Sequence, residues 1–178
     1  MKYKIKAYNL QELGQRQNQE DSLFPALGKS TSDDRLFVLC DGMGGHEKGE
    51  VASATVCETI SGTILSEWNP NEALSDELFL QGLSAAYDAL DAKDNGEERK
   101  MGTTPTFLCL HTNGATVAHI GDSRVYQLRP ASKKSLARIV FRTQDHSLVN
   151  DLVKIGEITE EEAKHHPQKN VITRAMQP

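Results

Sequence analysis

Short runs of alternating apolar and polar residues cover much of the chain, and two longer stretches show helical spacing instead. The central pattern is an apolar run at 36–40 that stops at Asp41 and is followed by the glycine-rich residues 42–49. The apolar run predicts a buried strand, and the glycines allow the backbone to pass close to a neighbour or to take positive φ. The next stretch predicts a long helix that ends before Pro70, with apolar positions at Val51, Ala54, Cys57, Ile60, Ile64, Leu65 and Trp68.

The other elements follow from the same periodicities. A second helix begins after Ser75, with a core-facing stripe of Phe79, Leu83, Ala86, Tyr87 and Leu90. Two short helices follow Ser147 and the capping box of Thr159 and Glu162. Strands are predicted at 2–7, 106–111, 116–120, 125–129 and 136–142, with a hairpin turn at Asn113-Gly114. Because hairpins dominate and no βαβ alternation occurs, the fold class is α+β with antiparallel sheets and helices outside them.

Composition narrows the class of protein. The 178 residues fit one domain, and 38% hydrophobic with 25% charged residues is ordinary for a soluble globular protein. The net charge of −5 argues against a general nucleic-acid or anionic-membrane surface, but it does not oppose divalent cations. The cysteines Cys40, Cys57 and Cys109 lie far apart among apolar residues. They predict buried free thiols and, with no apolar run of membrane-spanning length, a cytoplasmic protein.

Asp41 is the first candidate for chemistry. A carboxylate beside accessible glycine carbonyls offers the oxygen ligands that Mg²⁺ or Mn²⁺ requires. An ordinary strand–turn–helix connection with a surface Asp explains the same residues. Arg16 has a planar guanidinium suited to phosphate, Glu20 and Asp21 are paired carboxylates, and Asp122 lies in a glycine-marked break between strands.

Five segments in order resemble the metal-dependent serine/threonine protein phosphatases of the 2C type, in their bacterial form. They are Arg16–Ser22 (RQNQEDS), Leu39–Ser53 (LCDGMGGHEKGEVAS), Met101–Thr104 (MGTT), Gly121–Arg124 (GDSR), and Asp145–Ser147 (DHS) through Asn170–Ala175 (NVITRA). The resemblance covers nearly the whole chain. It implies an αββα sandwich of two stacked antiparallel sheets flanked by helices, with a two-metal centre at one end.

The resemblance also implies roles for individual residues. Asp41 would bridge two Mn²⁺ or Mg²⁺ ions, one of them bound by the Gly42 carbonyl, with Glu20 near the second ion and Asp21 supporting it. Arg16 would bind the phosphate, and Asp122 matches the position of a weaker third ion. A metal-bound hydroxide would attack phosphorus in line. The Gly102-Thr103 pair would let the backbone pack closely under the metal centre, and a plain turn explains it as well.

The chain departs from the family pattern in two ways. The histidine that some relatives place after the Asp-Gly pair is Met43 here, and the nearby His46 is not assigned its role, so water would protonate the leaving alkoxide. The two further metal aspartates of the family's C-terminal segment have no match, because Asp145 and Asp151 lie in other motifs. Residues 1–178 are therefore expected to be one catalytic domain without its C-terminal portion and last strands.

The sequence is compatible with two functions. The first is hydrolysis of phosphoserine and phosphothreonine in proteins, opposing a cognate kinase. The alternative is a truncated or inactive phosphatase-like domain that binds phosphoprotein or a partner without turnover. No nucleic acid or membrane is expected as a partner, and an exposed sheet edge would allow a dimer.

Overall fold

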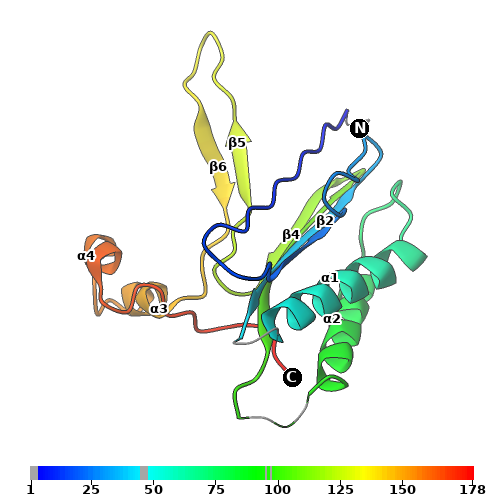
Figure 1. Cartoon of the computed structure of the whole chain (residues 1–178). Coiled ribbons are helices and arrows are strands. Elements are labelled where there is room, and N and C mark those ends of the chain that lie inside the picture. Colours follow the sequence, from blue (N-terminus) through cyan, green and yellow to red (C-terminus); the bar gives the residue numbers. More distant parts are fainter. Residues whose placement is uncertain (1–3, 45–47, 95, 97) are drawn as a thin grey trace.

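The computed structural model describes residues 4–44, 48–94, 96 and 98–178. Figure 1 shows a sheet with two long helices on one side, a projecting hairpin, and two short helices away from the sheet. In chain order the elements are β1 (Asp21–Phe24), β2 (Leu36–Met43), α1 (Lys48–Glu67), α2 (Asp76–Asp91), β3 (Gly102–His111), β4 (Gly114–His119), β5 (Tyr126–Arg129), β6 (Arg138–Arg142), α3 (Leu148–Lys154) and α4 (Glu160–His165).

The larger sheet has the strand order β1-β2-β3-β4, and every neighbouring pair is antiparallel. Successive side chains of a strand point to opposite faces. Leu36, Val38 and Cys40 of β2 are therefore buried in the core, whereas Leu39 and Asp41 lie on the other, open face. The alternation places the Asp41 side chain outside the core, near the end of its strand.

Helix α1 packs on β1, β2 and β3, and α2 packs against α1. The core between them contains fully buried Val56 and Ile64 of α1 and Leu90 of α2, and Phe79 of α2 meets Phe107 of β3 edge to face at 5.1 Å. All three cysteines are free and buried, as the sequence predicts. Within the described residues, none of the helices combines the length and apolar character that a membrane crossing requires.

The second sheet is the two-stranded antiparallel hairpin β5–β6. It projects beyond the end of the larger sheet (Figure 1), and every residue of both strands is exposed. Its apolar side chains Leu128 and Ile139 are 66% and 56% exposed. The α+β class with antiparallel sheets and flanking helices is confirmed, and the hairpin is the least buried part of it.

The strand predicted at 2–7 does not form over its described part, residues 4–7. Alternation gives a strand one apolar side, but a strand also requires a hydrogen-bonding neighbour, and none of the described strands pairs with this segment. Further along, the Asn9 amide donates to the carbonyls of Pro25 and Ala26 at 3.1 and 3.0 Å. A side chain therefore anchors the irregular N-terminal segment.

Some predicted core positions of the helices are exposed. Val51 and Leu65 of α1 are 39% and 46% exposed, and Tyr87 of α2 is 36% exposed. The packed face of α1 contains buried hydroxyls instead, among them Thr55 and Ser61, whose Oγ atoms donate to carbonyls four residues earlier at 2.6 and 2.7 Å. A hydroxyl satisfied in this way can be buried, which a count of apolar positions does not detect.

The hairpin between β3 and β4 is confirmed, with its turn one residue earlier than predicted. The register pairs His111 with Gly114, so Thr112 and Asn113 are the two turn residues. Gly114 has φ 144° and begins β4. Glycine is therefore favoured at the first position of β4, because a residue with a side chain would be strained in this backbone conformation.

Candidate functional site

Two carboxylates face each other across the first strand pair. The register of β1 and β2 sets Asp21 directly opposite Asp41, so both side chains lie on the same face of the sheet. Partial burial raises the pKa of Asp41, and the charges of Asp21 and Asp122 raise this pKa further. Like charges directly opposite destabilise an antiparallel pair. This corner of the sheet therefore favours a cation.

Close backbone packing positions the loop that carries Glu20. The Gly42 N–H donates to the Glu20 carbonyl at 3.0 Å, and the Ser53 hydroxyl of α1 donates to the same oxygen. A Cβ on Gly42 would lie 2.2 Å from the Gly49 carbonyl oxygen and 2.4 Å from that of Glu20. Only glycine fits here, and its absent side chain brings the loop and the start of α1 against the end of β2.

Arg16 reaches the same corner from the loop before β1. Its Nη1 lies 2.7 Å from Oε2 of Glu20, and the Arg16 side chain is 68% exposed whereas that of Glu20 is 17% exposed. The Arg16 charge opposes the rise in the pKa of Asp41. The guanidinium is thus held beside the carboxylates with most of its surface accessible, which suits recognition of a phosphate.

Asp122 joins the site from the turn after β4. Gly121 has φ 97°, and a Cβ there would lie 2.3 Å from Cγ2 of Thr104, so the turn packs tightly on β3. Beside it the hydroxyls of Thr104 and Ser123 lie 2.9 Å apart. Asp122 itself is exposed. Its effect on the pKa of Asp41 shows that the turn brings it within electrostatic reach of β2.

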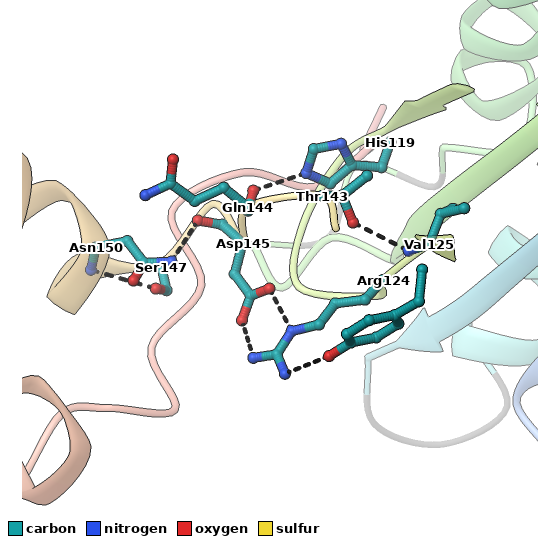
Figure 2. Close-up of polar contacts among 9 residues, drawn as sticks. His119, Arg124, Val125, Thr143, Gln144, Asp145, Ser147 and Asn150 are labelled. Carbon is teal, nitrogen blue, oxygen red and sulfur yellow. Dashed lines mark hydrogen bonds and ion pairs between the residues drawn. The ribbon is translucent and has the colours of Figure 1, made fainter. Parts of the chain in front are cut away.

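An ion pair fastens this turn to the segment before α3. Arg124 donates from Nε and Nη2 to both carboxylate oxygens of Asp145, and its Nη1 donates to the Tyr126 hydroxyl at 3.1 Å (Figure 2). These contacts raise the pKa of Arg124. Bidentate pairing fixes the geometry as well as the charge, so residues 122–126 and 143–147 are held together.

Two histidines complete the junction. The rings of His119 and His146 stack at 4.7 Å. Nε2 of His119 lies 2.8 Å from the Gln144 carbonyl (Figure 2). The Gly121 N–H donates to Nδ1 of His146 at 3.1 Å. Burial lowers the pKa of His146, and the charges of His119 and Arg174 lower it further. The lowered pKa favours the neutral imidazole, whose Nδ1 accepts from the backbone of the Asp122 turn.

The Gly102-Thr103 pair lies within β3, so it is not a plain turn. Thr103 donates from its hydroxyl to the Asp41 carbonyl at 2.8 Å, and its backbone pairs with Met176. A Cβ on Gly102 would lie 2.9 Å from the Gln177 side chain. Close packing at this pair thus brings Met176 and Gln177 alongside the start of β3.

The structure gathers the residues that the sequence singled out. Arg16, Glu20, Asp21, Asp41 and Asp122 meet at one corner of the sheet, as the contacts and charges above show. Among the described residues, no three His, Cys, Asp or Glu side chains are arranged so that they could hold a metal ion. The oxygen donors present suit Mn²⁺ or Mg²⁺ in kind, and they make up part of a ligand shell.

Other residues that the sequence analysis considered have different contacts or lie outside the described residues. Asp145 is paired with Arg124, and Asp151 of α3 accepts from the Thr173 hydroxyl at 3.0 Å. His46 lies outside the described residues. Sequence reasoning missed the supporting hydroxyls of Ser53 and Thr103, for which an isolated Ser or Thr gives no distinctive signal.

Comparison with known proteins identifies the family. The family model described as protein phosphatase 2C matches residues 12–177. Protein phosphatase PhpP of Streptococcus pneumoniae is 36% identical over 155 residues, which cover 79% of this chain and 55% of PhpP, so the chain spans about half the length of that relative.

Solved structures agree. The Mycobacterium tuberculosis serine/threonine phosphatase PstP/Ppp has a TM-score of 0.71 at 36% identity, covering 90% of this chain and 63% of that one. The catalytic domain of PstP in complex with two manganese ions has a TM-score of 0.66 at 33% identity, covering 90% and 61%. The chain belongs to the protein phosphatase 2C family.

Proposed function

We propose that the chain carries the phosphate-binding and part of the metal-binding machinery of a phosphatase that hydrolyses phosphoserine and phosphothreonine in proteins, using Mn²⁺ or Mg²⁺. The observation that carries the proposal is the facing pair Asp21 and Asp41, joined at one corner by Glu20, Asp122 and an exposed Arg16. The manganese-bound relative supports the choice of metal.

The residues have distinct parts in this proposal. Asp41, the Gly42 carbonyl, Glu20 and Asp21 would contribute ligands to two ions, and Asp122 would contribute to a weaker third. Bound Mn²⁺ or Mg²⁺ supplies an acidified water and neutralises phosphoryl oxygens. Arg16 binds the phosphoryl group through its planar fork and offsets the charge that develops during transfer. Met43 offers no proton, so the leaving alkoxide takes one from water.

The proposed enzyme is larger than residues 1–178. We propose that residues 1–178 belong to one catalytic domain that further C-terminal strands and metal-binding carboxylates complete. The exposed hairpin β5–β6 and the share of PhpP that the chain spans support this. Translating the reading frame past Pro178 tests it, since a sequence without a later Asp-Gly pair would contradict completion of this kind.

Mutation of Asp41 tests the activity in the full protein. With saturating Mn²⁺, hydrolysis of a phosphothreonine peptide is expected to fall at least about 100-fold in Asp41→Asn, because a charged metal ligand would be lost. The matched control is Asp88→Asn, which removes an exposed carboxylate of α2 and leaves the rate unchanged. A folded, metal-loaded wild-type protein that binds the peptide but leaves it intact would support the binding-module alternative instead.

We also propose a cellular location, a partner kinase and a dimer for the protein. A serine/threonine protein kinase in the cytoplasm supplies its phosphoprotein substrates, and the edge strands β1 and β4 offer pairing surfaces for a dimer. Light scattering of the full protein tests the dimer, and a monomer mass at micromolar concentration would exclude it.

A further inference from the structure

Charge is divided very unevenly along the chain. Residues 1–123 contain 10 Lys and Arg against 19 Asp and Glu, whereas residues 124–178 contain 10 against 6. The stretch from Val125 to Gln144, which includes the whole hairpin β5–β6, has five cations and no carboxylate: Arg129, Lys133, Lys134, Arg138 and Arg142. An acidic chain with a local surplus of exposed cations has one region suited to an anionic partner.

A polar cleft lies where this basic region meets the short helices. It has a volume of about 470 Å³ and is bounded by the end of β6, the segment before α3, and α3 and α4. Its lining includes four cations, Arg124, Arg142, Lys164 and Lys169, against two carboxylates, Asp145 and Glu160. Figure 2 shows one wall, where Arg124, Asp145 and Asn150 lie side by side.

The four cations of the cleft are not equivalent. Asp145 neutralises Arg124 through a bidentate pair, and Glu161 lies 2.6 Å from Lys164 in an exposed pair. Within the described part of the chain, no ion pair joins Arg142 or Lys169 to a carboxylate. These two side chains therefore supply the charge that the cleft can offer to a ligand.

We propose that this cleft docks an acidic segment of the phosphoprotein substrate, through Arg142 and Lys169. The cleft adjoins the metal corner, because Arg124 in its wall is two residues from Asp122 and is fastened to the same turn. One peptide can thus place its phosphorylated residue at the corner and flanking carboxylates in the cleft. The assignment of the ligand as a substrate rests on the proposed function, whereas the preference for an acidic peptide does not.

Shape and neighbouring charge favour a peptide over other polyanions. A concave cleft of this volume admits a few side chains, whereas a membrane surface is flat. A long nucleic acid would also meet the acid-rich residues 1–123. The side-chain amides of Gln144, Asn150 and Asn170 line the cleft and can hydrogen-bond a peptide backbone.

Fluorescence anisotropy with the full protein, without added metal, tests the docking site. The probe is an unphosphorylated 12-residue peptide with a central run of glutamates, and its matched probe has glutamine at those positions. Binding of the acidic probe is expected to exceed that of the glutamine probe and to weaken about fivefold or more in Arg142→Gln/Lys169→Gln, since two exposed ion pairs are lost. Raising salt should weaken it further.

The control variant is Lys133→Gln/Lys134→Gln, which removes the same charge from the hairpin tip outside the cleft. It should bind the acidic probe nearly as well as wild type. Equal losses in both variants, equal binding of both probes, or tighter binding of a DNA duplex or of phosphatidylserine vesicles would each overturn the proposal. Because this assay involves no turnover, an inactive protein that binds as expected would refute the proposed function alone.

Discussion

Gly42→Ala is expected to destabilise the protein more than any other exchange of glycine for alanine in α1 or β2. The added Cβ would lie 2.2 Å from the Gly49 carbonyl oxygen, so these backbones must separate by about 0.8 Å to reach even the shortest contact seen for real Cβ atoms, 3.0 Å. The second clash, 2.4 Å from the Glu20 carbonyl oxygen, also involves backbone. Neither neighbour can rotate away as a side chain would. Overpacking of this kind costs about 3 kcal/mol.

For a chain of this size, that loss corresponds to a fall in Tm of about 6–12 °C. Thermal unfolding followed by circular dichroism measures it, and Gly62→Ala is the matched control. Gly62 is exposed in α1, and no atom lies within 4 Å of the place that the added methyl would take, so the same exchange should raise stability by about 0.5–1 kcal/mol. If Gly42→Ala melts with the wild type, or both variants shift in the same direction, the close approach of β2, α1 and the Glu20 loop is wrong.

Two further predictions concern titratable groups. Since the pKa of His146 is lowered in the folded chain, the unfolded chain binds its proton more tightly, and the associated stability is present above pH 6.5 and lost as pH falls toward the folded value. The urea midpoint should therefore fall less between pH 7 and 5 in His146→Asn, whose amide oxygen can still accept from Gly121, and an unchanged pH dependence would contradict this. Burial raises the pKa of Cys109 to about 12, and a hydrogen bond with Cys57 together with burial raises that of Cys40. Ellman's reagent at pH 8 should consequently label these thiols only after urea is added, and rapid labelling of the native protein would show that the core is open.

Local patterns in the sequence were sufficient for the central unit of the fold. Three features form this unit: the apolar run before Asp41, the glycines after it and the long helix that follows. Each depends on residues that are close together in the sequence, and the periodicity of apolar residues detects such local relations. The strand predicted at 2–7 does not form over residues 4–7, the part that the structure describes, because a strand depends on a pairing neighbour. Likewise, Thr55 and Ser61 are buried because their hydroxyls bind backbone carbonyls of their own helix, which polarity scales do not register.

In the candidate site, too, local motifs were predicted and long-range contacts were not. Arg16, Glu20, Asp41 and Asp122 were found from motifs whose order and spacing are specific. The facing of Asp21 and Asp41 depends on the β1–β2 register, and the contact of His146 with Gly121 joins residues 25 positions apart. Such long-range relations are decided by packing of the whole chain, so a single sequence does not reveal them.

The Asp21–Asp41 pair also links ion binding to the integrity of the sheet. Strand β1 is four residues long and lies at the edge, where β2 is its only partner in the described sheet. Two facing negative charges loosen that attachment, and an ion shared between them would reverse the effect. By mass action, the binding energy of such an ion adds to the free energy of keeping β1 in place. Metal concentration would then govern how often the outermost strand frays, so the edge would behave as a reporter of ion loading.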